Sequence, residues 1–199
     1  TLDLINVSRN NGTREVDLFA GGLYMNGTQV HPSGNKGVIN VETNGQFGAE
    51  NLEGKFGNIY AGSMNGEFKG DVEINVARKD SSKKLIVGAI KASGALESRV
   101  SDNFFDGEEP QPPQAIPGSF PVKGNVTVKL DDYQVSVDGQ TGSEGKTSVV
   151  TSSRNFNTLK LKDVEHLTVE SGNIQPVFEN VETIKIPTVT LGSGAILDL

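Results

Sequence analysis

The sequence predicts an all-β chain built as a β-solenoid, in which short strands stack on one another along a common axis. Three observations lead to this fold class: strand patterns that recur between glycines, few helix-forming stretches, and a low share of apolar residues. Only 35% of the 199 residues are apolar, while 24 are glycine. This composition fits a thin, turn-rich β structure better than a thick helical core.

The first half of the chain repeats one unit three times: an apolar strand that ends in small residues, a loop, and an alternating strand. In the second alternating strand, Val72, Ile74 and Val76 alternate with polar residues, which indicates one buried face. The glycines at the corners are expected to permit positive φ angles. The apolar strands are expected at 16–22, 57–63 and 84–89, and the alternating strands at 37–41, 70–76 and 124–130.

The last third of the chain repeats more tightly. Residues 157–162 align with 182–187, and residues 166–172 align with 188–194. A repeat of this length is typical of solenoids, whose units stack strand on strand.

This alignment predicts which side chains stack in the core. We expect Leu159 to stack near Ile184 and Leu161 to stack near Ile186. The side chains expected to point inward are Phe156, Leu159, Leu161, Leu167, Val169, Val181, Ile184, Ile186, Val189, Leu191 and Ile196.

A proline-rich segment interrupts the third unit. Four prolines lie within residues 110–117, and this composition predicts a loop that is dispensable for folding. We expect a single solenoid over residues 1–199, with a loop insertion at about 102–121. The alternative is two β domains, 1–101 and 122–199, joined by this segment.

Charge and composition exclude several classes of function. The formal net charge is −7, and no basic run is longer than Lys83-Lys84, so a nucleic-acid footprint is missing. The absence of cysteine excludes disulfides and thiolate metal sites. No apolar run approaches the roughly 18 residues of a membrane-spanning helix. We therefore expect no nucleic-acid partner, no membrane insertion of this segment and no cofactor.

Residues 139–147 nearly match the phosphate-binding loop of nucleotide-binding proteins. That motif requires a glycine five positions before the glycine of Gly-Lys-Thr, and this position is Gln140. Residues 149–151 read as a strand, so the helix N-terminus that would supply a dipole and N–H donors is missing. We expect a polar hairpin loop, with nucleotide binding as the alternative.

Acidic residues and histidines offer weak candidates for a metal site. The spacing of the acidic residues in the insertion fits neither an EF-hand nor a calcium-binding repeat, so we expect solvated charge, with a weak Ca²⁺ site as the alternative. His31 and His166 have no partner at metal-binding spacing and are expected at the surface. The acidic residues in question are Asp102, Asp106, Glu108 and Glu109.

Paired carboxylates are the remaining catalytic candidates. Asp131 with Asp132, and Asp3 with Asp17, are pairs of the type that glycoside hydrolases use. No Gly-x-Ser-x-Gly elbow occurs. A platform for stacking sugar rings is poorly supplied, because the chain has no Trp and three Tyr. We expect no catalytic, cofactor-binding or metal-binding residues, and no enzymatic activity.

The unit at residues 57–76 resembles the repeats of large bacterial surface proteins, and so do the paired segments 167–172 and 191–199. Their style is similar to that of the passenger domains of autotransporters and filamentous-haemagglutinin-like adhesins. The resemblance implies a right-handed β-helix, export to the bacterial cell surface or beyond it, and adhesive work as part of a longer parent chain. It implies no site residues.

These observations predict a non-enzymatic structural or adhesive segment of a larger bacterial protein, which binds a glycan or a protein on host or neighbouring cells. The alternative is a carbohydrate-active enzyme, such as a polysaccharide lyase or hydrolase, or a phage-fibre-like module on a β-helical frame. Asp, Arg and Lys clustered on one repeated strand would favour the alternative, and none of the arginines aligns between repeats.

Overall fold

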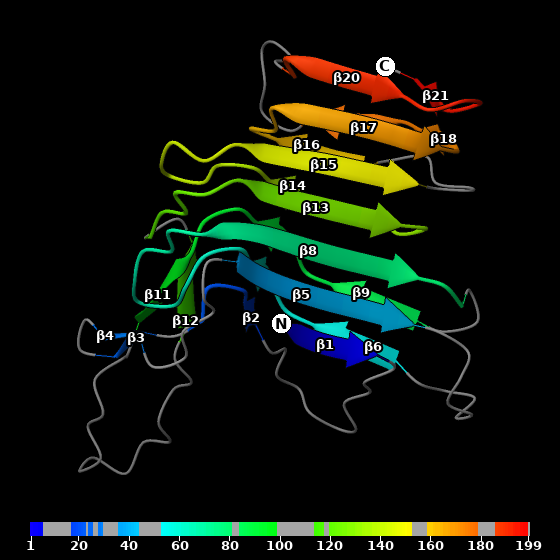
Figure 1. Cartoon of the computed structure of the whole chain (residues 1–199). Helices are drawn as coiled ribbons and strands as arrows, with labels where there is room; N and C mark the ends of the chain where they lie inside the picture. The colour runs from blue at the N-terminus through cyan, green and yellow to red at the C-terminus, as the bar shows by residue number, and fades with distance from the viewer. Residues whose placement is uncertain are drawn as a thin grey trace.

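The computed structural model is an all-β chain in which parallel strands stack into two main sheets (Figure 1). In the ranges that the structure describes, no helix occurs, so none is found there that could span a membrane. The predicted all-β class is confirmed. The described residues are 1–5, 17–22, 24–25, 28–29, 36–43, 53–80, 84–98, 114–117, 120–152, 159–178 and 186–198.

The larger sheet has seven parallel strands in the order β1-β5-β8-β13-β15-β17-β20, so its strands pair in the order in which the chain makes them. Alternation along each strand separates a buried face from an outer face. In β8, Val72, Ile74 and Val76 are at most 2% exposed, as the sequence predicts. The strands are β1 Leu2–Ile5, β5 Lys36–Thr43, β8 Asp71–Arg78, β13 Val126–Asp131, β15 Thr147–Ser152, β17 His166–Ser171 and β20 Thr188–Leu191.

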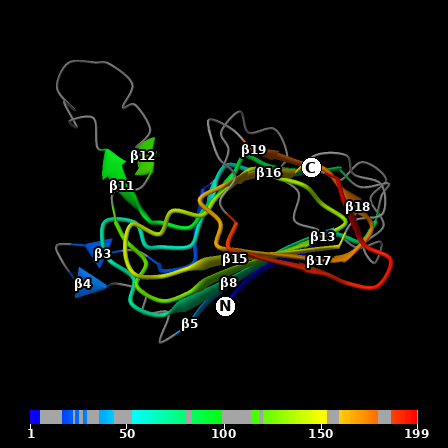
Figure 2. The ribbon, with the colours of Figure 1, turned by 90° about the horizontal axis from the view of Figure 1, so that it is seen from above.

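The second sheet has six parallel strands in the order β19-β16-β14-β10-β7-β2 and lies across the core from the first (Figure 2). The chain passes from a strand of this sheet to a strand of the seven-stranded sheet and back again. We call each such pass a rung, and this solenoid-like course agrees with the predicted class. The strands are β2 Leu18–Phe19, β7 Ile59–Tyr60, β10 Ile90–Lys91, β14 Val137–Asp138, β16 Leu159–Lys162 and β19 Pro176–Phe178.

Four small sheets complete the described structure, each with two strands. Two of them are parallel: β6 (Glu53–Phe56) with β9 (Lys84–Val87), and β18 (Asn173–Ile174) with β21 (Ile196–Leu197). The other two are antiparallel and project from the same side of the stack (Figure 2). They pair β3 (Tyr24–Met25) with β4 (Thr28–Gln29), and β11 (Ala95–Ser98) with β12 (Gln114–Pro117).

The proline-rich insertion is not wholly a loop. Its last residues form β12, which pairs antiparallel with β11, so the loop prediction is wrong at this end. Proline is tolerated there because Pro117 ends the strand. Residues 99–113 lie outside the described residues. On either side of the insertion, β8 and β13 pair directly, so the seven-stranded sheet contains strands from both 1–101 and 122–199.

The register confirms some of the predicted repeats and corrects others. Residues 166–169 pair with 188–191, as the offset of the last repeat predicts. Residues 84–87 instead pair with β6, and Ile90-Lys91 is the counterpart of Ile59-Tyr60. Both 84–87 and 90–91 contain apolar residues next to polar ones, so the sequence pattern alone did not show which of the two segments joins which sheet.

An additional strand, β19, lies next to β16. Leu159 pairs there with Pro176, and its predicted partner Ile184 lies outside the described residues. Leu161 pairs with Phe178 on one side and with Val137 on the other, so no position beside it in this sheet is left for Ile186. The intervening strand β19 was missed, because its proline does not read as a strand residue.

Glycine is required at the corners because the backbones of successive rungs touch there. A Cβ atom on Gly62 would lie closer than 3.0 Å to Gly94, and one on Gly124 would clash with Gly70 in the same way. Among the described glycines, Gly22, Gly142, Gly172 and Gly194 have positive φ. Close approach of two backbones therefore explains Gly62 and Gly124, and it adds a second reason for glycine to the expected positive φ.

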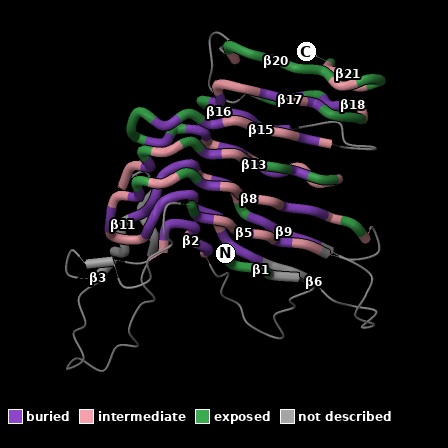
Figure 3. Tube along the Cα trace, in the orientation of Figure 1, coloured by how far each residue is buried: buried purple, intermediate pink, exposed green. Residues whose placement is uncertain are grey.

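The predicted inward-facing residues divide between the inside of the stack and its C-terminal end (Figure 3). Leu159, Leu161, Leu167 and Val169 are buried as predicted, and Ile186 is partly buried against the core. Three predicted core residues are exposed instead, because no further described strand covers the last rung: Val189 (44%), Leu191 (51%) and Ile196 (57%). Phe156 and Val181 lie outside the described residues.

Candidate functional site

The parallel register stacks outward-facing residues of the seven-stranded sheet into columns that run along the axis of the stack. Two columns define the candidate site, and both cross several strands. The central column consists of Asp3, Asn40, Asn75, Lys129, Val150, Thr168 and Thr190. The edge column, nearer the carboxyl ends of the strands, consists of Glu42, Ala77, Asp131, Ser152 and Ser171.

A side-chain ladder ties the first three strands of the central column together. Asn75 Nδ2 donates a hydrogen bond of 2.6 Å to Asn40 Oδ1, and Asn40 Nδ2 donates to Asp3 Oδ1. Because each amide both donates and accepts, the ladder continues from strand to strand without an unpaired group between them. It holds the outer face of β1, β5 and β8 in one arrangement.

Glu73 on β8 is the centre of an ion cluster on this face. Its carboxylate lies 2.9 Å from Lys129 Nζ on β13 and 3.0 Å from Lys36 Nζ on β5, and it accepts a hydrogen bond from Asn75 Nδ2. The hydrogen bond from Lys129, followed by those from Lys36 and Asn75, lowers the pKa of Glu73 to about 2. Glu73 therefore stays ionised and links three strands.

The outer face is hollowed beside these columns into an open groove of about 490 Å³. Its volume lies within the range of small-molecule sites. The hollow arises because Ala77 and Ser152, on β8 and β15, are shorter than Glu42 and Asp131, which precede and follow Ala77 in the edge column. The groove is lined by Glu42, Asn75, Val76, Ala77, Lys79, Lys129, Leu130, Asp131, Val150, Ser152 and Glu170.

Two charged groups of the groove, Lys79 and Glu42, form an ion pair with each other. Lys79 Nζ lies 2.8 Å from Glu42 Oε2, and this hydrogen bond raises the pKa of Lys79 above its ordinary value. Ser152 Oγ donates a hydrogen bond of 2.9 Å to Asp131 Oδ1. Because the Lys79 side chain is half exposed, its ion pair contributes little to stability and can rearrange around a ligand.

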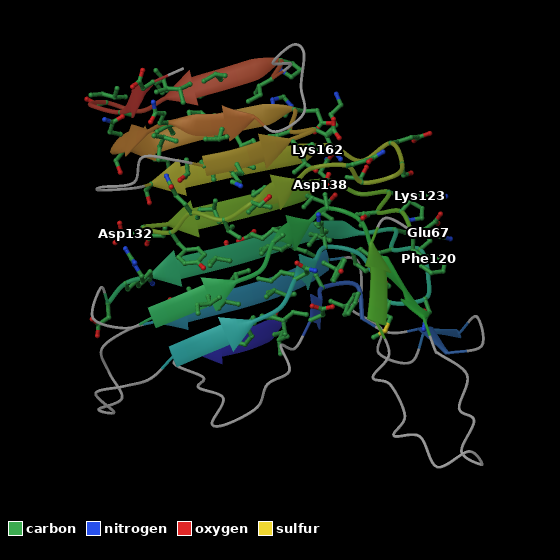
Figure 4. The ribbon with its side chains drawn as sticks, turned by 180° about the vertical axis from the view of Figure 1, so that it is seen from behind. Glu67, Phe120, Lys123, Asp132, Asp138 and Lys162 are labelled. Atoms are coloured by element: carbon green, nitrogen blue, oxygen red, sulfur yellow. The ribbon has the colours of Figure 1, made fainter. Side chains whose placement is uncertain are left out.

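The outer face of the six-stranded sheet carries a second side-chain ladder, which consists of ion pairs and a pair of stacked rings. Asp138 on β14 lies 3.6 Å from Lys91 Nζ and 3.5 Å from Lys162 Nζ on the two neighbouring strands (Figure 4). Further along the same column, the rings of Phe19 and Tyr60 stack with centroids 4.7 Å apart. Tyr60 is only 1% exposed, so its ring contributes to the stability of the fold and offers no face to a sugar.

The structure does not bring the predicted carboxylate pairs together as pairs. Asp3 lies on β1 in the central column, whereas Asp17 precedes β2 of the other sheet and accepts a hydrogen bond of 2.7 Å from the Asn58 backbone N–H. Asp132 lies in the turn after β13 (Figure 4), with a φ of 51°. Asp131 is among the residues that line the groove, and Asp132 is not.

The segment that resembles a phosphate-binding loop is a corner between β14 and β15. These strands belong to different sheets, so the prediction of a hairpin is wrong, although the loop is polar as expected. Thr147 Oγ1 donates to the Gly139 carbonyl at 2.7 Å, and the Thr147 N–H donates to Glu165 Oε2 at 2.6 Å. A strand follows instead of a helix, so the helix N-terminus of a phosphate-binding loop is missing from this corner.

The metal candidates find little support in the described part of the chain. No group of three or more His, Cys, Asp or Glu side chains there could hold a metal ion. His166 is half-buried on the outer face of β17, between Ser148 and Thr188 on the neighbouring strands. His31 and the acidic residues 102–109 lie outside the described residues.

Sequence reasoning missed the groove because its lining comes from five strands far apart along the chain. The signal was present in the alternating patterns, since the polar positions of aligned strands define the outer columns once the register is known. No model of a known protein family matches this chain, and neither a characterised protein nor a solved structure is significantly similar to it.

Proposed function

We propose that this chain is a right-handed β-helical segment of a bacterial surface or secreted protein, and that it works as a non-enzymatic structural and adhesive element. The observation that carries the proposal is the outer face of the seven-stranded sheet, where polar columns surround an open groove. Such a face presents many hydrogen-bonding groups in fixed positions to a ligand outside the molecule.

The ladders support a binding role because they organise the surface before a ligand arrives. The amides of Asn40 and Asn75 and the ion cluster at Glu73 each connect neighbouring strands. A preorganised surface loses less side-chain entropy on binding than a set of free side chains. The low pKa of Glu73 is the opposite of what a general acid needs at neutral pH.

The repeat style of residues 57–76 and 167–172 supports export and surface display, through its resemblance to bacterial passenger domains. The parallel stack also suits such a role, since each rung contacts mainly its neighbours and the array can be extended without changing the site. The ligand class in this proposal is a glycan or a protein on another cell.

One observation favours the alternative of a carbohydrate-active enzyme. Glu42 and Asp131 belong to one column and are separated by a single strand that carries the small residue Ala77. Two strand spacings amount to about 9.6 Å, which is close to the upper end of the roughly 6.5–9.5 Å that separates the two carboxyl groups in inverting glycosidases. This pair, rather than those predicted from the sequence, is the catalytic candidate that the fold offers.

One experiment separates the two functions. Beads coated with the protein are applied to bacterial and epithelial cells, and the soluble protein is incubated with a panel of polysaccharides at several pH values. The proposal predicts retention of the beads and no release of reducing ends or unsaturated products. Turnover that Asp131→Asn or Glu42→Gln abolishes, while circular dichroism shows an intact fold, would establish the enzyme instead.

A further inference from the structure

We propose that the groove beside Ala77 binds a segment of an uncharged polysaccharide, laid across the strands along the axis of the stack. This inference rests on the proposed adhesive function and deepens it by naming the class of ligand and the residues that hold it. The shape of the groove, its hydrogen-bonding groups and its charge all favour this ligand.

The shape of the groove fits an extended polymer. Its lining comes from β5, β8, β13, β15 and β17, five successive strands of the sheet. Four strand spacings correspond to a length of about 19 Å. Because the groove is open to solvent and crosses the strands, a linear chain can enter and leave it without threading.

The hydrogen-bonding groups of the groove fit hydroxyl groups. Lys79 supplies N–H donors, while Glu42 and Asp131 supply carboxylate acceptors beside it. A sugar hydroxyl donates one hydrogen bond and accepts others, so it can join the carboxylate and the ammonium of a pair such as Glu42–Lys79. When such a neutral ligand binds, the carboxylate and the ammonium of the pair stay next to each other and continue to neutralise each other.

The charge of the groove disfavours a polyanion. The ammonium groups of Lys79 and Lys129 lie 2.8 Å and 2.9 Å from carboxylates of this chain, Glu42 and Glu73 respectively. Asp131 and the exposed Glu170 add negative charge to the same groove, in a chain whose formal net charge is −7. A polycation is therefore the competing ligand, and its binding would weaken steeply with salt.

The floor of the groove sets the mode of recognition. Ala77, Val150 and Ser152 form a low surface, and the lining contains no aromatic ring. Recognition therefore depends on hydrogen bonds rather than on ring stacking. Removing carboxylate acceptors should weaken binding, and a bulky side chain on the floor should block it.

The test measures binding by affinity electrophoresis through gels that contain dextran, a linear β-glucan, a glucomannan or a xylan. Polygalacturonate and polylysine serve as the charged probes, and each binding measurement is repeated at about 0.5 M salt, where the Debye length is only a few ångströms. The groove variants are the double substitution Asp131→Ala with Glu170→Ala, and the single substitution Val150→Trp. The matched control, Glu144→Ala with Asp198→Ala, changes the net charge equally at exposed sites outside the groove.

The proposal predicts that at least one uncharged polysaccharide binds and that salt leaves this binding unchanged. Both groove variants should weaken it by about tenfold or more, roughly the loss of one charge-assisted hydrogen bond, while the control keeps it. Failure of every uncharged polymer, binding of polylysine alone, or binding that survives both groove variants would overturn the proposal. Beads that still adhere to cells in such a case would leave the adhesive function standing.

Discussion

The middle of the stack and its C-terminal end are built from the same kind of strand but bury their apolar residues to very different extents. Ile74 on β8 is completely buried between β5 and β13, whereas Leu191 on β20 is 51% exposed. Both strands alternate and both pair in register with a neighbour. Burial in this fold therefore comes from a rung on each side, and the sequence of a single strand does not determine it.

The largest expected effect comes from truncating the same kind of side chain in both regions. Ile74→Ala should lower the free energy of unfolding by about 2–5 kcal/mol, because it leaves a cavity in a packed core. Leu191→Ala removes a half-exposed side chain and should cost less than about 1.5 kcal/mol. Urea unfolding monitored by circular dichroism measures both changes, and equal losses would contradict the comparison.

The second-largest effect on stability is expected from a tyrosine that caps a strand edge in the middle of the stack. Tyr133 Oη accepts a hydrogen bond of 3.0 Å from the Val87 N–H and donates one of 3.2 Å to the Leu85 carbonyl, so it caps the edge of β9. Tyr133→Phe leaves both backbone groups unpaired and should cost about 1–3 kcal/mol.

A second tyrosine serves as the control for this substitution. Tyr60 Oη accepts one hydrogen bond of 3.3 Å from Asn58 Nδ2 and caps no strand. The loss for Tyr60→Phe in urea unfolding should therefore be the smaller of the two. The opposite order would show that the Tyr133 hydroxyl does not cap the edge.

The ion cluster makes the middle of the stack sensitive to acid. The pKa of Glu73 is about 2 in the folded chain, against an ordinary value of 4.5. Stability from this shift is fully present above about pH 4.5 and is lost as the pH falls toward 2. After allowance for solvent screening, we expect a contribution of about 1 kcal/mol.

Thermal unfolding between pH 2 and pH 6 measures this contribution through three variants. Glu73→Gln should flatten the pH profile over this range, because it removes the titrating group. Lys129→Met should flatten it more than Lys36→Met, since the hydrogen bond from Lys129 is the largest cause of the low pKa. If wild type and Glu73→Gln have the same pH profile of thermal stability, the ion cluster does not cause the sensitivity to acid.

The smallest expected effect distinguishes two buried threonines of β15. Among the described residues, Thr151 Oγ1 has no hydrogen-bond partner, whereas Thr147 Oγ1 donates to the Gly139 carbonyl at 2.7 Å. Thr151→Val should therefore leave stability unchanged or raise it by up to about 1 kcal/mol, while Thr147→Val should lower it by about 1 kcal/mol. Differential scanning calorimetry resolves the two signs, and a loss in both variants would show that Thr151 is satisfied.

The sequence was sufficient for the strands that alternate strictly. Val72, Ile74 and Val76 on β8, and the pairing of 166–169 with 188–191, follow from a period of two and a constant repeat. It was not sufficient for strands of two or three residues such as β19, whose pattern is too short to read. It also overestimated the burial of Val189 and Leu191, because alternation identifies the inner face and not what covers it.

The candidate site could not be predicted from the sequence, for a related reason. Glu42, Ala77 and Asp131 become neighbours only through the register of β5, β8 and β13, and the loops between these strands differ in length. Local motifs drew attention to Gln140 and to the acidic insertion instead. A site assembled from one residue per rung has no local signature, so it emerges only after the strands are aligned.

The central claim is that the outer face of the seven-stranded sheet binds the ligand and performs no chemistry on it. Nuclear magnetic resonance of the labelled protein, titrated with an uncharged oligosaccharide, tests this most directly. The account predicts shifts of the amide signals of Asn75, Ala77, Asp131 and Ser152, with Lys91 and Asp138 on the opposite sheet unchanged and the oligosaccharide intact. Shifts confined to the six-stranded sheet or to the exposed rung at Leu191, or the appearance of cleavage products, would contradict it.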